Sequence, residues 1–240
     1  MENNWQKIWD NKKSQLDEIN ANDEQKIIFE LKRLAGWDGF GTGASIAFSE
    51  IKKEYEYLRD NLKTGGGTVF ELGCGSGSNL YFFHKDGFKI GGLDYSPNLL
   101  AIAKKVIGAE NFVEAIVGDA SELPTEIKYD AVFSGSAFPY FPDLEYTEKV
   151  LDRMLAKATK CIATVRMLKE ETKDDYFKYR RAHDKNFDER YKDLPKLFIP
   201  KKFFTDYAAK NNLDVEFPHH NLEGFWNNEF NFDCFMYKKI

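Results

Sequence analysis

Apolar residues recur at helical spacing in the first quarter of the chain. Between residues 23 and 34 they return every three or four positions, which predicts a helix capped by Asn22 or Asp23. Residues 36–43 hold four glycines in eight positions, a composition that favours a loop with wide backbone freedom. A second helix is predicted over residues 45–62, before a run of three glycines.

From residue 68 onward, short apolar runs alternate with segments of helical periodicity. The predicted strands are residues 69–72, 89–93, 112–117, 129–134 and 161–165, with two closing strands at 215–217 and 232–237. The predicted helices are residues 79–85, 97–107, 145–158 and 200–211. This alternation predicts parallel strands joined by right-handed crossovers, in a doubly wound α/β sheet.

The chain therefore divides into parts of different character. Residues 1–67 form an N-terminal helical part with a glycine-rich loop, and residues 68–240 form the α/β core. Within the core, residues 167–199 are irregular and dense in charge, and we interpret them as an insertion that covers a site. A chain of 240 residues accommodates one such domain with additions.

Composition narrows the class of protein further. The net charge of −5 and the sequence pI of about 5.5 argue against a nucleic-acid partner, which calls for an excess of Lys and Arg. The three cysteines are far apart in sequence, so we expect reduced thiols and no metal site. No apolar run is long enough to span a bilayer, and the N-terminus is polar. We expect a cytoplasmic protein without a membrane partner, as a monomer or homodimer.

Three successive predicted strands each end in a distinctive group. Gly73, Gly75 and Gly77 follow the first strand, Asp94 ends the second and Asp119 follows the third. The glycines allow a ligand to approach the backbone, and an acid at the end of the second strand commonly accepts hydrogen bonds from two ribose hydroxyls. Asp119 could accept a hydrogen bond from an adenine amino group.

A dinucleotide-binding domain is the main competitor, and its glycine spacing is missing. The third glycine of Gly-x-Gly-x-x-Gly falls on Ser78 in one register and on Leu80 in the other. Glu71, two residues before the glycines, would repel a pyrophosphate but suits a ligand that carries a cationic amine. The glycine spacing and Glu71 both disfavour a nicotinamide-dependent oxidoreductase.

These residues resemble the class I (Rossmann-like) S-adenosylmethionine-dependent methyltransferases. Glu71-x-Gly73-x-Gly75-x-Gly77 is similar to their first motif, and Gly118-Asp119-Ala120 to their adenine-flanking segment. The resemblance covers residues 68–166 and implies a seven-stranded sheet whose last strand runs antiparallel to its neighbours. It implies S-adenosylmethionine as cofactor, with S-adenosylhomocysteine as product. The candidate cofactor-binding residues are Glu71, Gly73, Cys74, Gly75, Gly77, Asn79, Asp94, Tyr95, Ser96, Asp119, Ala120, Ser134 and Gly135.

Three further segments resemble methyltransferases encoded beside bacterial surface-polysaccharide genes. They are residues 38–43, 138–142 and 230–232. This narrower resemblance implies O-methylation of a sugar-linked or capsule-type small molecule. An N-methyltransferase of a small amine and a non-catalytic S-adenosylmethionine-binding module remain alternatives. The segment Ser134-Gly135-Ser136-Ala137 lacks the Pro-Pro and aromatic pattern of amino-methylating DNA enzymes, so base methylation is disfavoured.

Candidates for catalysis and for acceptor binding come from the segments around this site. His183 lies in the covering insertion and could act as a general base, and Tyr140 follows the fourth strand near the expected methyl group. The candidate substrate residues are Phe40, Phe141, Arg166, Arg180, His219 and His220. Tyr140 and Phe141 could equally pack against the next helix, and a charged surface helix would account for Arg180. The glycine-rich loop with Phe40 could close the site as a lid.

Overall fold

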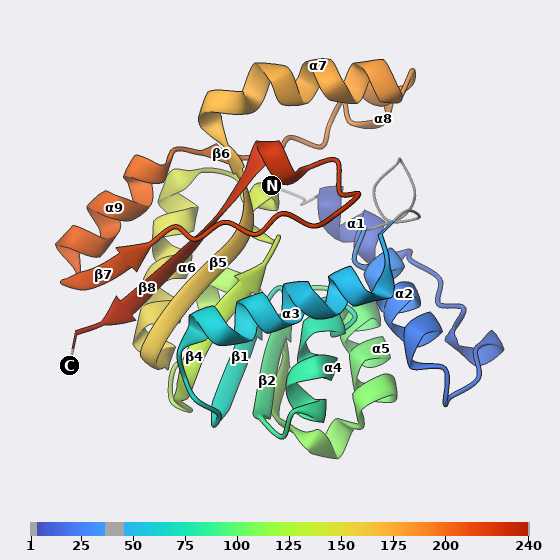
Figure 1. Ribbon diagram of the computed structural model, residues 1–240, viewed down its shortest axis with the longest axis vertical. Helices are drawn as coiled ribbons and strands as arrows, with labels where there is room; N and C mark the ends of the chain where they lie inside the picture. The colour runs from blue at the N-terminus through green and yellow to red at the C-terminus, as the bar shows by residue number, and fades with distance from the viewer. Residues whose placement is uncertain (1–3, 37–45, 240) are drawn as a thin grey trace.

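The protein forms one mixed β-sheet with helices on both faces (Figure 1). This computed structural model describes residues 4–36 and 46–239. The strands are β1 (Thr68–Leu72), β2 (Lys89–Asp94), β3 (Phe112–Val117), β4 (Tyr129–Gly135), β5 (Ala158–Lys169), β6 (Phe198–Ile199), β7 (Leu213–Glu216) and β8 (Asn231–Lys238). The α-helices are α1 (Asn4–Asp10), α2 (Glu24–Leu34), α3 (Phe48–Leu62), α4 (Ser78–Lys85), α5 (Pro97–Ile107), α6 (Leu144–Lys157), α7 (Lys173–His183), α8 (Phe187–Arg190) and α9 (Lys201–Lys210).

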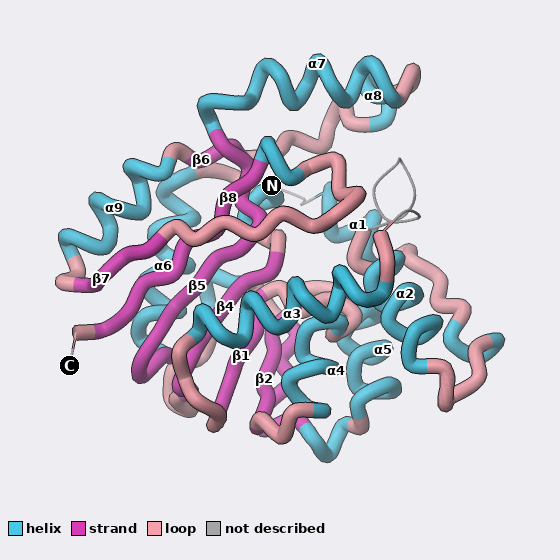
Figure 2. The backbone as a smooth tube through the Cα atoms, in the orientation of Figure 1, coloured by secondary structure: helices cyan, strands magenta, loops and turns pink. Residues whose placement is uncertain are grey.

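The strand order confirms the doubly wound architecture expected from the sequence. It runs β3-β2-β1-β4-β5-β8-β7, and the short β6 pairs with the end of β5. Figure 2 shows β8 between β5 and β7. β8 is antiparallel to both neighbours, and the pairs without β8 are parallel. The sheet has eight strands where seven were expected, because the two-residue β6 is too short to leave a periodic pattern.

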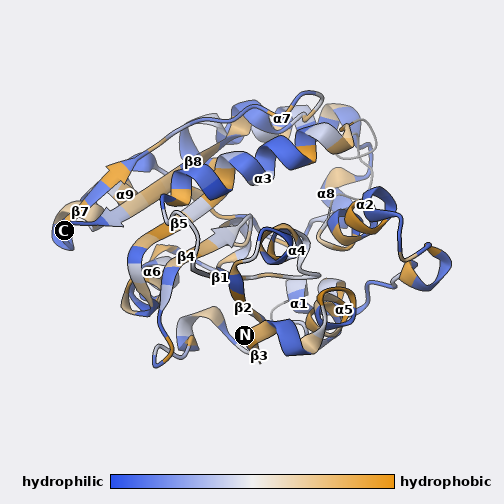
Figure 3. Cartoon of the chain, turned by 60° about the horizontal axis from the view of Figure 1, so that its bottom comes forward, coloured by the Kyte–Doolittle hydropathy of each residue, from blue (hydrophilic) through white to orange (hydrophobic). Residues whose placement is uncertain are grey.

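Successive residues of a strand bury against opposite helical layers. In β1, Val69 packs into the apolar cluster formed with α2 to α5, and Phe70 packs into the cluster formed with α6 and α9. Figure 3 shows helix α3 with alternating hydrophilic and hydrophobic colouring, as expected for a helix with one face on the sheet. Burial on both sides explains why the central strands read as continuous apolar runs.

Capping residues, prolines and glycines in the sequence predicted the ends of most helices and strands. The Ser96 side chain caps α5 by accepting a hydrogen bond from the Leu99 amide, with Pro97 at the first helical position. The largest difference is β5, which was expected to end at residue 165 and instead continues to Lys169. Arg166 adopts a positive φ of 60° where the register with β8 shifts, so the strand passes through an irregularity and then resumes.

Three α-helices lie outside the helices that the periodicity predicted, although a charged surface helix is one interpretation of the segment around Arg180. Helices α7 and α8 fill the stretch interpreted as irregular, and α7 lies beyond the C-terminal end of β5 (Figure 1). Helix α1 is anchored by a hydrogen bond from Trp5 Nε1 to the Pro195 carbonyl (3.0 Å) and one from Gln6 Nε2 to the Tyr95 carbonyl (3.2 Å). Seven residues are less than two helical turns, so the spacing of Trp5 and Trp9 is the available periodic signal in this helix.

In the described part of the chain, no helix combines the length and apolarity needed to cross a bilayer. The proposed lid loop, including Phe40, lies outside the described residues apart from Gly36.

Candidate active site

A cavity of about 630 Å³ lies at the C-terminal ends of the parallel strands. Its lining includes the ends of β1, β2 and β4, residues 165–166 of β5 and the residues that follow β3. The strand order reverses between β1 and β4, and open α/β sheets bind ligands at this switch point. The cavity has a floor built from the glycine loop and a far wall built from α3, β5 and the C-terminal segment.

The glycine loop turns sharply at the end of β1. The amides of Gly73 and Cys74 both donate to the Leu93 carbonyl, at 2.7 and 3.0 Å. Gly73 has a φ of +71°, and a Cβ there would lie 2.6 Å from the Cβ of Ala137. Glycine is therefore required at this position for two reasons, backbone conformation and close packing against the loop after β4.

Asp94 organises this loop from the end of β2. One of its carboxylate oxygens accepts from the Gly75 amide at 2.7 Å and the other from the Ser96 amide at 2.8 Å. The side chain is buried, and burial raises the pKa of Asp94 to about 6. A carboxylate oxygen can accept more than one hydrogen bond, so Asp94 can receive ligand hydroxyls while it holds the loop.

Glu71 lies beneath the loop, and one of its two carboxyl oxygens has a hydrogen-bond partner. Oε1 accepts a hydrogen bond from Asn79 Nδ2 at 2.6 Å, whereas Oε2 is buried without a hydrogen-bond partner. Burial raises the pKa of Glu71 to about 8. A cationic group placed against Oε2 would remove the cost of burying this oxygen unpaired.

An aromatic and acidic wall lies past β3 and β4. Asp119 Oδ1 accepts hydrogen bonds from the Tyr146 hydroxyl at 2.7 Å and from the Ser121 amide at 2.8 Å. The ring of Tyr146 meets that of Phe141 edge to face at 5.0 Å. Ala120 completes this side of the cavity, where a flat apolar group with polar edges would fit.

The far wall begins with a buried group of charges. Glu54 Oε1 lies 2.5 Å from Arg166 Nε, and its Oε2 lies 3.1 Å from Lys32 Nζ. Although burial acts in the opposite direction, these two cations lower the pKa of Glu54 to about 2. Arg166 has a φ of +60° at the irregularity in β5, where the register with β8 shifts.

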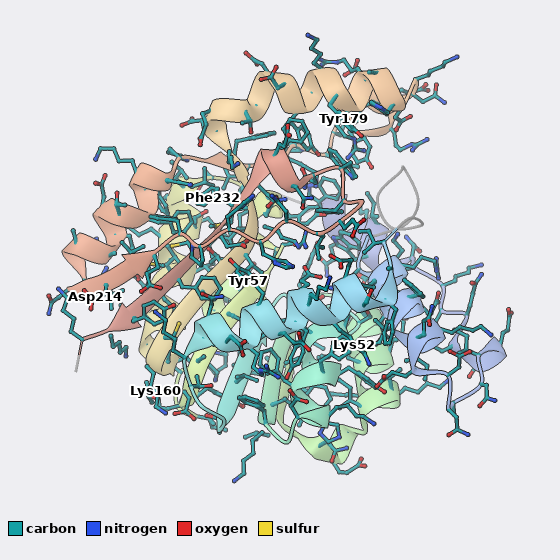
Figure 4. The ribbon with its side chains drawn as sticks, viewed as in Figure 1. Lys52, Tyr57, Lys160, Tyr179, Asp214 and Phe232 are labelled. Atoms are coloured by element: carbon teal, nitrogen blue, oxygen red, sulfur yellow. The ribbon has the colours of Figure 1, made fainter. Side chains whose placement is uncertain are left out.

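The wall continues with a chain of polar contacts across three elements. The Tyr57 hydroxyl donates to Asp233 Oδ2 at 2.8 Å, and the Arg166 amide donates to Asp233 Oδ1 at 2.7 Å. The His220 ring stacks on Tyr57 with centroids 4.9 Å apart. Tyr57, labelled in Figure 4, lies on α3 and joins that helix to β8 through Asp233.

Aromatic side chains of α1 form another side of the cavity. Trp5 and Trp9 both line it and meet the Tyr140 ring at 4.7 and 5.5 Å. Lys196 Nζ lies 4.1 Å from the centroid of the Tyr140 ring. The structure thus brings Tyr140 to the cavity in contact with a helix that the sequence did not predict.

Most sequence-predicted cofactor residues line this cavity. They are Glu71, Gly73, Cys74, Gly75, Asn79, Asp94, Tyr95, Asp119, Ala120 and Gly135. Three others do not. Gly77 packs against Ala103 of α5, Ser96 caps that helix, and Ser134 is buried in β4.

The acceptor and catalytic candidates separate into two groups. Phe141, Arg166 and His220 line the cavity together with Tyr140. His219 is exposed and outside the lining, although its neighbour His220 lies within it.

Two candidates from the covering insertion lie away from the cavity, which corrects the expectation. His183 is exposed at the end of α7, where its ring stacks on Tyr179 at 4.0 Å. Arg180 is buried among aromatic rings, with its guanidinium carbon 4.9 Å from the Phe187 ring and 5.2 Å from the Trp226 ring. Both side chains pack against neighbouring aromatic rings around α7. The local sequence does not show which way these side chains point.

Several cavity residues were not among the site candidates predicted from the sequence. Trp5 and Trp9 belong to the unpredicted α1, and their spacing of four residues was the available signal. Glu54 and Tyr57 belong to a predicted helix, but nothing in one sequence says which face of that helix meets Asp233. In the described residues, no group of three or more His, Cys, Asp or Glu side chains could hold a metal ion.

Comparison with known proteins agrees with this geometry. Residues 69–160 match the family model described as a methyltransferase domain. A nonribosomal peptide synthetase of Metarhizium robertsii is 28% identical over 134 residues, which is 52% of this chain and 2% of the synthetase. Peramine synthetase of Metarhizium rileyi is 29% identical over 133 residues, 50% of this chain and 4% of that protein. The chain thus spans a small fraction of these curated relatives.

Solved structures share the fold at low sequence identity. Magnesium protoporphyrin IX methyltransferase of Synechocystis with bound S-adenosylhomocysteine has a TM-score of 0.61 and 13% identity, covering 90% of this chain and 100% of that one. An amino pentose methyltransferase of Micromonospora echinaspora has a TM-score of 0.57 and 10% identity, covering 80% and 91%. Residues 69–160 thus match a methyltransferase-domain model, and they lie within a fold that this chain shares with solved methyltransferases.

Proposed function

We propose that the chain transfers the methyl group of S-adenosylmethionine to a hydroxyl group of a polar, sugar-linked small molecule. The observation that carries the proposal is the division of one cavity into a cofactor floor and a polar far wall. The floor offers Glu71 and Asp94, and the far wall offers hydrogen-bonding side chains from α3, β5 and β8.

The floor fits the cofactor residue by residue. Glu71 Oε2, buried and without a hydrogen-bond partner, would receive the amino group of the methionine portion, and Asp94 would receive the ribose hydroxyls. The wall of Asp119, Phe141 and Tyr146 would enclose the adenine. When bound, the cofactor supplies an activated methyl group on a sulfonium. The protein's own task is to hold the acceptor in line and to exclude water.

The far wall supports a polar acceptor. Its charges are balanced, with Lys32 and Arg166 facing Glu54 and Asp233, so it offers hydrogen bonds rather than a strong field of one sign. Such a wall suits an uncharged molecule with several hydroxyls. The structural neighbours carry names with chemically different acceptors, so the fold by itself does not select among them.

Two experiments test the proposal. Calorimetric titration with S-adenosylmethionine, S-adenosylhomocysteine and NAD should give binding of the first two and none of NAD. Transfer of tritiated methyl groups is then measured to free monosaccharides, sugar phosphates and nucleotide sugars, each paired with its amino-sugar counterpart. Labelling confined to the amino sugars would replace oxygen by nitrogen as the methylated atom. A chain that binds NAD alone would contradict the cofactor assignment.

A further inference from the structure

Three cavity-lining residues in the described part of the chain each have a buried polar atom without a hydrogen-bond partner. They are Glu71 Oε2, the Tyr95 hydroxyl and His220 Nε2. Leaving such an atom unpaired costs about 1–3 kcal/mol, so these positions indicate where a ligand or water completes the site. The first two belong to the cofactor floor. His220 belongs to the far wall, on the segment between β7 and β8.

The ring of His220 is held by its neighbours. It stacks on Tyr57 with an interplanar angle of 18°. The Tyr57 hydroxyl donates its one hydrogen to Asp233 Oδ2 at 2.8 Å, and it also lies 3.1 Å from the Pro218 carbonyl oxygen. This stacking fixes the plane of the imidazole.

The electrostatic surroundings keep His220 neutral near pH 7 and still able to accept a proton. The charged groups that act on it are Glu50 and Glu54 of α3, Arg166 of β5 and Asp233 of β8. Burial lowers the pKa of His220, and the three carboxylates partly offset that effect. A neutral imidazole has one free lone pair, and nearby carboxylates stabilise the imidazolium that forms when the lone pair takes a proton.

We propose that His220 is the general base of the reaction, with Nε2 accepting the proton of the acceptor hydroxyl. The inference rests on the proposed methyl transfer to oxygen. The acceptor oxygen bonds to the methyl carbon as the carbon–sulfur bond breaks, and that bond's electron pair remains on sulfur. The hydroxyl proton moves to Nε2 and leaves later as an imidazolium proton to solvent. The assignment requires that the other nitrogen, Nδ1, carries the hydrogen in the resting protein.

The other polar groups of the far wall are less suited to this task. The Tyr57 hydroxyl is already a donor to Asp233, and burial raises its pKa. Asp233 accepts hydrogen bonds on both oxygens, from Tyr57 and from the Arg166 amide. Glu54 is a weak base because its pKa lies at about 2.

The test compares His220→Gln with His84→Gln, the same substitution on helix α4 outside the cavity lining. Both variants should bind S-adenosylhomocysteine within about twofold of the wild type, because His220 lies outside the cofactor floor. Transfer to the hydroxyl compounds named above should fall about 10²–10⁴-fold in His220→Gln and stay unchanged in His84→Gln. With S-adenosylmethionine held saturating at each pH, the fall in wild-type kcat/KM for the acceptor at low pH should be smaller in His220→Gln.

A second readout does not depend on turnover. The chain has four histidines, so protein labelled with ¹⁵N in histidine and bound to S-adenosylhomocysteine gives few signals, and the His220 signal is the one missing from His220→Gln. We expect Nε2 to be the unprotonated nitrogen at pH 7. A protonated Nε2, or normal transfer by His220→Gln, would overturn the assignment. Wild-type protein that does not bind the cofactor, or that binds it and methylates no hydroxyl compound, would instead refute the proposed function on which the assignment rests.

Discussion

Replacing Glu71 with Gln removes a titratable group from the cavity floor and keeps an oxygen that can accept from Asn79. In the folded protein the pKa of Glu71 is raised from 4.5 to about 8 by burial. The folded state therefore favours the protonated carboxyl. The stability that this protonation contributes is fully present below pH 4.5 and is lost as the pH rises through about 8. The Gln variant keeps the neutral form at every pH. Its advantage in free energy of unfolding should grow from about 1 kcal/mol at pH 5 to about 4 kcal/mol at pH 8.

Urea denaturation of the cofactor-free protein at pH 5, 7 and 8 measures this difference. A matched control is Glu54→Gln, because the pKa of Glu54 is lowered to about 2 and its contribution has the opposite sign. The Glu54 carboxylate stabilises the folded state above pH 4.5, and this stabilisation is lost as the pH falls through about 2. At pH 7 the free energy of unfolding of Glu54→Gln should therefore be about 3 kcal/mol below that of the wild type. Glu71→Gln should also weaken S-adenosylmethionine binding by about 1.5–3 kcal/mol, the range for a hydrogen bond to a charged group.

The two effects of Glu71→Gln are expected together, a more stable free protein and a weaker complex. A stability difference that does not change between pH 5 and pH 8 would show that the Glu71 carboxyl is not perturbed by burial. A Gln variant with normal cofactor affinity would show that the carboxylate does not receive the amino group of the ligand. The first result would refute the raised pKa of Glu71, and the second would refute its role in cofactor binding.

Three further substitutions test the cavity floor. Asp94→Ala should weaken S-adenosylmethionine binding by more than about 1.5 kcal/mol through two lost hydrogen bonds, and unchanged affinity by calorimetry in a folded variant would contradict the ribose assignment. Gly73→Ala should lower the free energy of unfolding by about 1–3 kcal/mol, because its Cβ would lie 2.6 Å from Ala137 at a φ of +71°; denaturant melts at wild-type stability would show that the loop relaxes. Tyr146→Phe should cost about 1 kcal/mol of cofactor affinity by freeing Asp119, and equal calorimetric affinity would separate that pair from adenine binding.

The core of the fold could be predicted because its signals are local. A buried strand, a glycine turn and a capped helix each occupy a few consecutive residues, so Ser96 and Pro97 locate the start of α5 without any knowledge of the sheet. The same holds for the cavity floor, because Glu71 and Asp94 sit at strand ends that the topology brings together.

The far wall could not be predicted because its contacts join distant parts of the chain. Tyr57 and Asp233 are 176 residues apart in sequence and meet only when α3 packs across the sheet. A single sequence carries no signal for that pairing. His183 shows the converse difficulty, since its position in a covering segment suggested a site residue, while the α7 helix directs it to solvent.

The place of β8 in the sheet has a consequence for how the structure opens. β7 pairs with β8 and has no pairing with β5, so its ladder hydrogen bonds exist only while β8 is in place. A fluctuation that releases β8 must also free β7, whereas β7 can detach and leave β8 paired with β5. Amide hydrogen exchange of β7 should therefore never be slower than that of the β8 amides paired with β5. Since Asp233 lies on β8, an opening that reaches this strand also dismantles the far wall of the cavity.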